Sequence, residues 1–234
     1  MCRVMSYNIH SGVGRDKKQD YNRIGKFLAT SKANIVLLQE MDTRPANRSI
    51  EQDVKDICAN NTFQLIKSPA LEEKSGWYGN AVLTRFDVLS HKTYDISQPG
   101  RQPRNIQLVE VLTRHGPLTV MNTHLGLKRW ERHTQLSLIC DVIEKRVEKH
   151  KTPLLLAGDF NEWQFFTQAF RRLNRLLNQR FFGPTFPSGF PIFSLDRAWV
   201  TPNLRVVEAS KIKNQETSVL SDHLPLFLDI SLPY

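Results

Sequence analysis

The sequence predicts a layered α/β fold in which mixed strands are covered by helices on both sides. Two short runs of uninterrupted apolar residues, 35–38 and 154–157, are typical of strands that are buried on both faces. Between such strands lie stretches with apolar residues at helical spacing, the longest of them at about 129–150. Interleaved strands and helices favour sheets in the centre with helices outside, so we expect a sandwich.

The first half of the chain contains several predicted strands and two predicted helices. We expect strands at 3–9 and 35–38, two strands within 80–94, and a hairpin that joins 106–112 to 118–123. Tyr21, Ile24 and Phe27 recur at helical spacing and predict a first helix. Val54 and Ile57 indicate a second one.

The second half begins with the longest predicted helix. Its buried stripe is expected to consist of apolar residues spaced three or four apart: Leu136, Ile139, Ile143 and Val147. A strand at 154–157 follows Pro153, and 163–180 is predicted to be helical, with inward-facing Phe166, Phe170, Leu173 and Leu177. Three closing strands are expected at 193–200, 204–209 and 224–230.

Length, charge and cysteine usage limit the classes of function. The 234 residues show no repeat or linker-like stretch, so we expect a single domain over 1–234 that is a monomer. No segment approaches the roughly 18 apolar residues of a membrane span. The three widely spaced cysteines favour a reducing, cytoplasmic location, with peripheral membrane contact left open. The net charge of +9 favours anionic partners: nucleic acid, a phospholipid surface or small phosphorylated molecules.

Polar clusters lie at the ends of several predicted strands, where α/β enzymes place their chemistry. In chain order they are Ser6-Tyr7-Asn8, Gln39-Glu40, Thr123-His124-Leu125, Gly158-Asp159-Phe160-Asn161, Leu195-Asp196-Arg197 and Ser221-Asp222-His223-Leu224-Pro225. Each fragment alone has an ordinary structural explanation as a turn or a solvated strand exit. Their combination in this order, over nearly the whole chain, has no such ordinary structural explanation.

This ordered set resembles the endonuclease/exonuclease/phosphatase superfamily of metal-dependent phosphohydrolases. The resemblance implies a four-layer α/β/β/α sandwich of the deoxyribonuclease-I-like type. It also implies hydrolysis of a phosphoester, for which we favour a phosphodiester of the phospholipid type or another small phosphodiester. Two alternatives stay open: an endo- or exonuclease acting on DNA or RNA, and a non-catalytic phosphate-binding relative. The fold alone does not name the substrate.

Phosphoester hydrolysis needs a nucleophilic water and neutralised phosphoryl oxygens, which a hard cation with oxygen ligands provides. Glu40 is the first candidate metal ligand for Mg²⁺ or Mn²⁺. Asn8 is expected either to coordinate through its amide oxygen or to fix Glu40 by a hydrogen bond. The resemblance adds Asp222 as a ligand of a second ion or as an outer group.

The remaining motif residues have expected roles in proton transfer and charge stabilisation. Asp159 is expected to deprotonate the attacking water, and Asn161 to donate to a phosphate oxygen. His223 is the expected donor to developing negative charge, oriented by Asp196, which alternatively pairs with a neighbouring base. His124 is expected to be a second phosphate donor.

Three further features are less specific. Asn80 and Arg104 are candidate substrate-binding residues, although a solvated arginine is an equal alternative for Arg104. The stretch 181–193 holds five phenylalanines. It is predicted either to fold back onto the sandwich or to form an apolar rim for a lipid or a stacked base.

Overall fold

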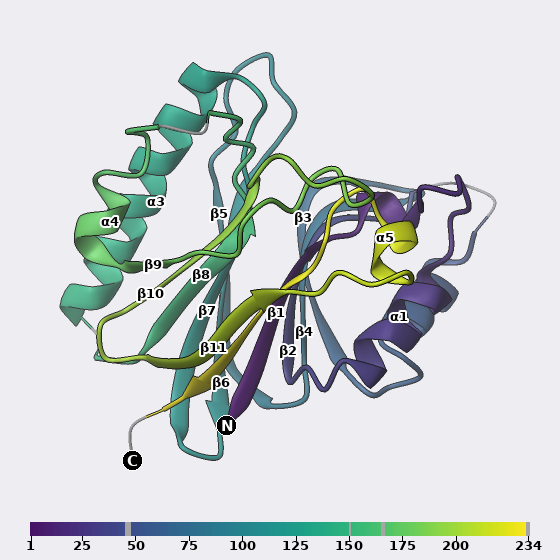
Figure 1. Cartoon of the computed structure of the whole chain (residues 1–234), viewed down its shortest axis with the longest axis horizontal. Helices are drawn as coiled ribbons and strands as arrows, with labels where there is room; N and C mark the ends of the chain where they lie inside the picture. Colours follow the sequence, from purple (N-terminus) through teal and green to yellow (C-terminus); the bar gives the residue numbers. More distant parts are fainter. Residues whose placement is uncertain (45–47, 150, 165–166, 233–234) are drawn as a thin grey trace.

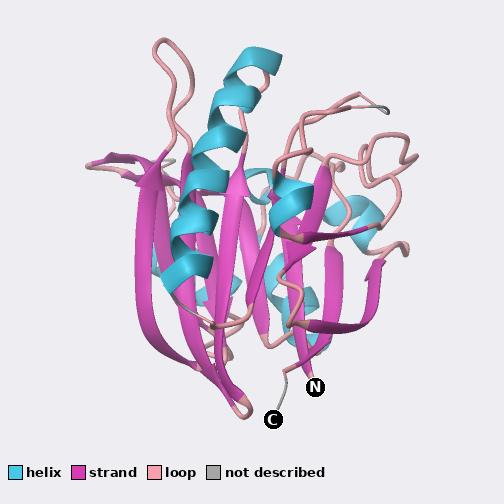
Figure 2. Ribbon diagram, turned by 90° about the vertical axis from the view of Figure 1, so that its left-hand side faces the viewer, coloured by secondary structure: helices cyan, strands magenta, loops and turns pink. Residues whose placement is uncertain are grey.

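Two mixed sheets lie face to face, with helices on both outer surfaces (Figures 1 and 2). The computed structural model describes residues 1–44, 48–149, 151–164 and 167–232. This arrangement confirms the layered sandwich that the sequence pattern predicts and the four-layer α/β/β/α type that the family resemblance implies.

Each sheet contains six strands within the described residues. The first has the order β11 (Arg205–Lys211), β12 (Leu226–Ser231), β1 (Cys2–Asn8), β2 (Ile35–Asp42), β4 (Gly76–Thr84) and β3 (Gln64–Glu73). The second has the order β5 (Asp87–Asp95), β6 (Asn105–Thr113), β7 (Gly116–His124), β8 (Leu154–Asp159), β10 (Asp196–Val200) and β9 (Asn178–Arg180). Among the paired strands of the described residues, only the central pairs β1–β2 and β7–β8 are parallel.

The helices divide between the two outer faces. They are α1 (Tyr21–Thr30), α2 (Ile50–Ile57), α3 (Arg129–Lys149), α4 (Leu173–Leu176) and α5 (Thr217–Leu220), with a 3₁₀ turn η1 at His10–Gly12. In Figure 1, α3 and α4 lie beside the second sheet, and α1 and α5 lie on the opposite side of the molecule. The Asp20 side chain accepts from Arg23 N and begins α1, and the Ser49 side chain accepts from Gln52 N and begins α2.

Three apolar clusters fill the spaces between the four layers. One, including Ile24 and Leu38, lies between the first sheet and its helices. A second, including Val4 and Val120, lies between the two sheets. The third, including Ile139 and Trp199, lies between the second sheet and α3. Strands in the middle of both sheets are therefore covered on both faces, which explains their uninterrupted apolar runs.

Most predicted elements are confirmed, but one predicted helix is wrong. In the part of 163–180 that the structure describes, only Leu173–Leu176 is helical, and Asn178–Arg180 is a strand. The side chains of Phe170, Leu173 and Leu177 are buried in the core beside α3. Their helix-like spacing therefore arises from single buried residues of a mostly irregular segment. Phe166 lies outside the described residues.

Smaller differences concern α3, an edge strand and the cysteines. The predicted helix end at His150 lies outside the described residues, and Val147 is 46% exposed instead of buried. Strand β3 was not predicted, because most of its side chains are polar or half-exposed at the sheet edge. The three cysteines are buried and unpaired, as expected. Among the described helices, none has the length and apolarity to cross a membrane.

Candidate active site

The strand-end motifs meet at one end of the paired sheets, opposite the two chain termini (Figure 1). Asn8, His124 and Asp159 are the last residues of β1, β7 and β8, and Glu40 lies near the end of β2. Because β1 pairs with β2 and β7 with β8 in parallel, the carboxyl ends of each pair emerge together. Asp196 opens the neighbouring β10 opposite Asp159, and His223 comes from the loop before β12.

Local backbone features direct two of these side chains. Glu40 has a φ of +60° where the β2–β4 register shifts, and this bulge turns its side chain away from the strand's normal alternation. Asn161 has a φ of +49° in the turn after β8. Gly158 packs so closely on β7 that an added Cβ would lie 1.9 Å from Thr123 O, which explains the glycine before Asp159.

The carboxylate of Asp159 is the centre of the cluster. Its Oδ2 accepts a hydrogen bond from Asn8 Nδ2 at 3.0 Å, and its Oδ1 accepts from Asn161 N at 2.8 Å. Two imidazole Nε2 atoms approach Oδ2, that of His124 at 3.6 Å and that of His223 at 3.7 Å. Donors from both sheets therefore surround one buried carboxylate oxygen.

Burial is the main cause that raises the pKa of Asp159 to about 6, reinforced by Asp196. The positive charge on His223 and the hydrogen bonds from Asn161 and Asn8 oppose this increase. A carboxylate with such a pKa is largely ionised near neutral pH yet accepts a proton more readily than a solvated one. Those are the properties required of a general base.

His223 forms a second buried pair with Asp196. Its Nδ1 lies 2.8 Å from Asp196 Oδ2, which also accepts the Thr185 hydroxyl at 2.5 Å. Burial alone would lower the pKa of His223, but the carboxylates of Asp196 and Asp159 outweigh it and raise the value to about 10. The ring is therefore an imidazolium at neutral pH, with Nε2–H directed toward Asp159.

Asn8 holds Glu40 next to this centre. Its Nδ2 donates to Glu40 Oε1 at 3.0 Å, while its Oδ1 accepts from His10 N at 3.0 Å. Ser221 Oγ donates to the Asn8 carbonyl at 2.8 Å and ties the loop of His223 to the end of β1. The amide oxygen of Asn8 is thus occupied by the backbone, and its nitrogen orients the carboxylate of Glu40.

The remaining predicted residues surround this centre at different depths. Asn80 and Arg104 are both buried and line a small cavity together with Glu40, Tyr78 and His124. The alternative of a solvated Arg104 is therefore wrong. Asp222 lies farther out, half-exposed, with Oδ1 3.8 Å from His10 Nδ1.

A family model described as the Endonuclease/Exonuclease/phosphatase family matches residues 5–223. The chain belongs to this family. Uncharacterized protein YbhP of Escherichia coli K12 is 27% identical over 260 residues, which cover 98% of this chain and 96% of that protein.

Solved structures of the same fold include a phosphatase and a protein in complex with a DNA product. Mannosyl-6-phosphatase Bt3783 of Bacteroides thetaiotaomicron superposes with a TM-score of 0.81 at 17% identity, covering 99% of this chain and 100% of that one. Danio rerio TDP2, solved with a single-strand DNA product, has a TM-score of 0.73 at 16% identity, covering 98% of each chain. At these identities the two structures support the shared fold alone, and family membership supports phosphoester hydrolysis.

Members of this family are generally dependent on a divalent metal ion, and the donor chemistry of this chain fits one. Ligand atoms of Asp159, Asp196 and His223 lie within 4.8 Å of one another. In this trio, however, the His223–Asp196 hydrogen bond occupies the Nδ1 atom, and His223 carries a proton that a metal would have to displace. The carboxylate of Glu40 is more accessible and is a hard oxygen donor, which suits Mg²⁺ or Mn²⁺ better.

An aromatic wall, formed by Trp163, Phe186 and Phe193, stands beside His223. Trp163 packs on the other two rings at centroid distances of 5.5 and 5.1 Å, and Phe186 lies 4.9 Å from the His223 ring. Phe190, at the tip of the same loop, is 78% exposed. The phenylalanine-rich stretch therefore divides, with part of it folded back against the site and its tip open to solvent.

Sequence reasoning missed Thr185, and it did not predict the contact between Gln39 and Asn122. Thr185 lies within the phenylalanine-rich stretch, and no sequence signal connects it with Asp196. Gln39 Nε2 donates to Asn122 Oδ1 at 2.7 Å between the two sheets, directly below the site. Gln39 belongs to the Gln39-Glu40 motif and Asn122 directly precedes Thr123-His124-Leu125, so their positions at the strand ends were the available signal.

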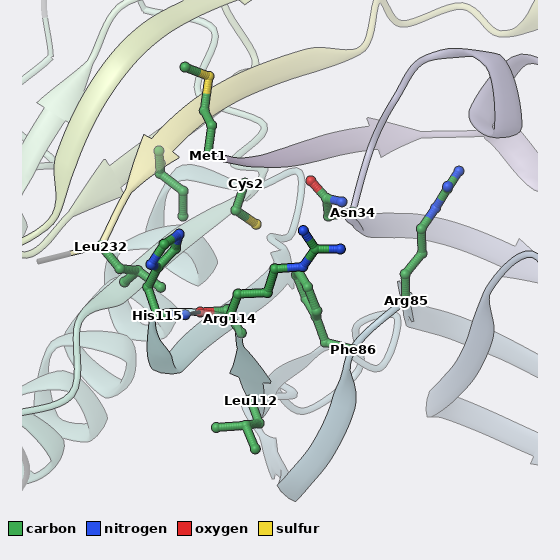
Figure 3. Close-up of a pocket in the computed structure, with 11 residues that line it drawn as sticks. Met1, Cys2, Asn34, Arg85, Phe86, Leu112, Arg114, His115 and Leu232 are labelled. Carbon is green, nitrogen blue, oxygen red and sulfur yellow. Dashed lines mark hydrogen bonds between the residues drawn. The ribbon is translucent and has the colours of Figure 1, made fainter. Parts of the chain in front are cut away.

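A separate cavity of about 650 Å³ lies at the other end of the sandwich, near the chain termini (Figure 3). Met1, Cys2, Phe86, Arg114 and Leu232 are among the residues that line it. None of the motif residues contributes to its wall. The larger cavity is therefore distinct from the place where the acid, histidine and asparagine side chains converge.

Proposed function

We propose that this chain is a divalent-metal-dependent phosphodiesterase that acts on a phospholipid-type or other small phosphodiester. The observation that carries the proposal is the convergence of Asn8, His124, Asn161 and His223 on the buried carboxylate of Asp159. A buried acid with a raised pKa beside an imidazolium is a costly arrangement for a purely structural role and a useful one for hydrolysis.

In this proposal Asp159 orients the attacking water and takes up its proton through Oδ2. The imidazolium of His223 donates Nε2–H to negative charge that develops on the phosphoryl group, and Asp196 keeps its ring oriented. His124 Nε2 and Asn161 Nδ2, only 3.1 Å apart, contact another phosphoryl oxygen. These donors are fixed before the substrate arrives, so little reorganisation is needed during the reaction.

Glu40 would hold the cation, with Asn8 as the residue that orients it and Asp222 as an outer carboxylate. When bound, Mg²⁺ or Mn²⁺ neutralises phosphoryl oxygens and makes a coordinated water more acidic. The bulge at Glu40 and the hydrogen bond from Asn8 present the carboxylate toward the cavity lined by Asn80 and Arg104. Asn80 borders this cavity, where it is a candidate contact for the substrate.

The aromatic wall and the exposed Phe190 favour a substrate with an apolar portion next to the phosphate. The net charge of +9 favours anions in general and does not distinguish lipid from nucleic acid. A nuclease is the second candidate, since aromatic rings beside a phosphate site also stack on unpaired bases. A nuclease would show affinity that falls steeply with salt.

The test is a turnover screen of the purified full chain with Mg²⁺ or Mn²⁺. The panel contains bis-p-nitrophenyl phosphate, p-nitrophenyl phosphate, sphingomyelin and phosphoinositide vesicles, plasmid DNA and RNA, and Asp159→Asn is the inactive control. We expect the diester and a lipid substrate to be cleaved faster than the monoester and the nucleic acids. Preferential cleavage of DNA or RNA would replace this proposal by the nuclease. Absence of turnover with every substrate would support a non-catalytic relative.

A further inference from the structure

Arg104 contacts His124 in a way that restricts where the imidazole carries its proton. Arg104 Nη1 lies 3.0 Å from His124 Nδ1, and Arg104 Nη2 donates to Gln102 Oε1 at 3.1 Å. The arginine is only 5% exposed, so water does not compete freely for these contacts. A guanidinium is a donor and never an acceptor, and it stays protonated in proteins. His124 Nδ1 must therefore accept.

A second donor faces the other nitrogen of the same ring. Asn161 Nδ2 lies 3.1 Å from His124 Nε2 and also donates to Leu125 O at 2.9 Å. An imidazole carries at least one N–H, so its two nitrogens cannot both be acceptors. Arg104 cannot become an acceptor, so Nδ1 cannot carry the ring proton. The Asn161 amide does not need Nε2 as an acceptor, because it already donates to Leu125 O. The remaining place for the ring proton is Nε2.

We infer that Arg104 is a positioning residue that fixes the ring proton of His124 on Nε2. His124 Nε2–H and the Asn161 amide are then two donors 3.1 Å apart that cannot satisfy each other. A phosphoryl oxygen, which accepts more than one hydrogen bond, resolves this conflict by accepting from both. The inference rests on the proposed function for the identity of the acceptor, but the tautomer follows from the contacts alone.

The surroundings of His124 agree with this assignment. Burial, followed by the charges of Arg104 and His223, keeps the pKa of His124 well below its usual value. The two histidines of the site thus have opposite partners at Nδ1, a carboxylate for His223 and a guanidinium for His124. One is a charged donor and the other a neutral donor, and both direct Nε2 toward Asp159.

This inference changes the role expected of Arg104 from direct contact with a substrate phosphate to action through His124. The two roles have different kinetic signatures. Loss of a phosphate contact that is equally strong in the ground state and the transition state would raise KM and leave kcat unchanged. Loss of a correctly placed donor would mainly lower kcat.

The decisive measurement is the tautomer of His124 in the full-length protein by long-range ¹H–¹⁵N NMR after labelling histidine. The His124 signals are assigned by their loss in His124→Gln. We expect the wild type to show an unprotonated Nδ1 and a protonated Nε2, and Arg104→Met to lose this pattern. Arg104→Lys, which retains a donor, should recover it at least in part. Protonated Nδ1 in the wild type, or an unchanged pattern in Arg104→Met, overturns the inference.

Kinetics provide the second readout, with Arg101→Met as the matched control because Arg101 is exposed in the same loop. We expect Arg104→Met to lower kcat by about 10- to 100-fold with KM nearly unchanged, as for other partners that orient a site histidine. Arg101→Met should retain wild-type kcat. A raised KM at unchanged kcat in Arg104→Met overturns the inference. Should the wild type hydrolyse no ester, the proposed function fails, and the NMR result still decides the tautomer.

Discussion

Asp159 Oδ2 lies 3.7 Å from His223 Nε2, within strong electrostatic range but beyond a direct hydrogen bond. The pKa of each group is nevertheless raised, that of Asp159 mainly by burial and that of His223 by the carboxylates of Asp196 and Asp159. Each charge favours the ionised form of the other, while burial penalises both. A water or phosphoryl oxygen that contacts both groups would lie between a base and an acid.

Asp159→Asn should lower kcat by at least about 100-fold, because the variant cannot take up a proton. The melting temperature should stay the same or rise, since the substitution removes a buried carboxylate whose ionisation is unfavourable in the folded state. Asp87→Asn, at an exposed position at the start of β5, is the matched control and should not change turnover. Loss of activity that accompanies a large drop in melting temperature would assign Asp159 a structural role.

The pH profile of kcat/KM should be bell-shaped. Turnover should increase through about pH 6, as Asp159 ionises, and decrease near pH 10, as His223 loses its proton. Asp196→Asn removes the carboxylate that most raises the pKa of His223, so the alkaline limb should move to lower pH. An alkaline limb that is unchanged in Asp196→Asn would show that another group controls it.

The ion pair between His223 and Asp196 predicts a change of the free energy of unfolding with pH. The pKa of His223 is raised from 6.5 to about 10, so the folded state binds the proton more tightly than the unfolded state does. The contribution of this group is fully present below about pH 6.5 and is lost as the pH increases through about 10. Urea unfolding at pH 7, 8.5 and 10 should show a smaller decrease in Asp196→Asn than in the wild type. Equal decreases would contradict the assignment.

Glu40→Gln should increase the Mg²⁺ concentration needed for half-maximal turnover by roughly 10-fold or more, since an ionised ligand becomes neutral. Excess chelator should abolish wild-type turnover. Glu208→Gln, at an exposed residue of β11, is the control and should leave the metal requirement unchanged. Full activity in chelator would exclude the proposed role of the metal.

Phe190→Ala should weaken the cleavage of lipid vesicles without altering the cleavage of soluble bis-p-nitrophenyl phosphate or the melting temperature. The ring is 78% exposed and has little packing to lose. Phe181, which is 79% exposed at the start of the same stretch, supplies the control Phe181→Ala. Equal effects of the two substitutions on vesicle cleavage would contradict a specific role for the loop tip.

The sequence predicts the fold well where burial leaves a simple pattern. The apolar runs of β2 and β8 identify central strands, because only strands covered on both faces lack polar residues. The edge strand β3 has no such constraint. The described part of the segment after Trp163 buries isolated apolar residues with only the short helix α4. Pattern reasoning fails in both cases because neighbouring layers decide what is buried.

The sequence predicts which residues form the candidate site, but it does not predict the contacts between them. Strand-end motifs indicate which side chains gather, whereas hydrogen-bond partners depend on loop conformations that the sequence does not encode locally. The hydrogen bonds of Thr185 to Asp196 and of Arg104 to His124 are examples, because a loop brings Thr185 and Arg104 to the site. The position of a proton on His124 depends on such a partner.

The hydrogen bond between Gln39 and Asn122 joins β2 to β7 across the interior, next to the strand ends that carry Glu40 and His124. Each sheet therefore contributes only part of the chemistry, and the parts meet only where the sheets are docked. An intermediate that has formed one sheet and its helices would have no turnover. Recovery of activity during refolding should then follow the burial of the inter-sheet interior and lag behind the recovery of helical circular dichroism. Turnover would thus report the last assembly step of this chain.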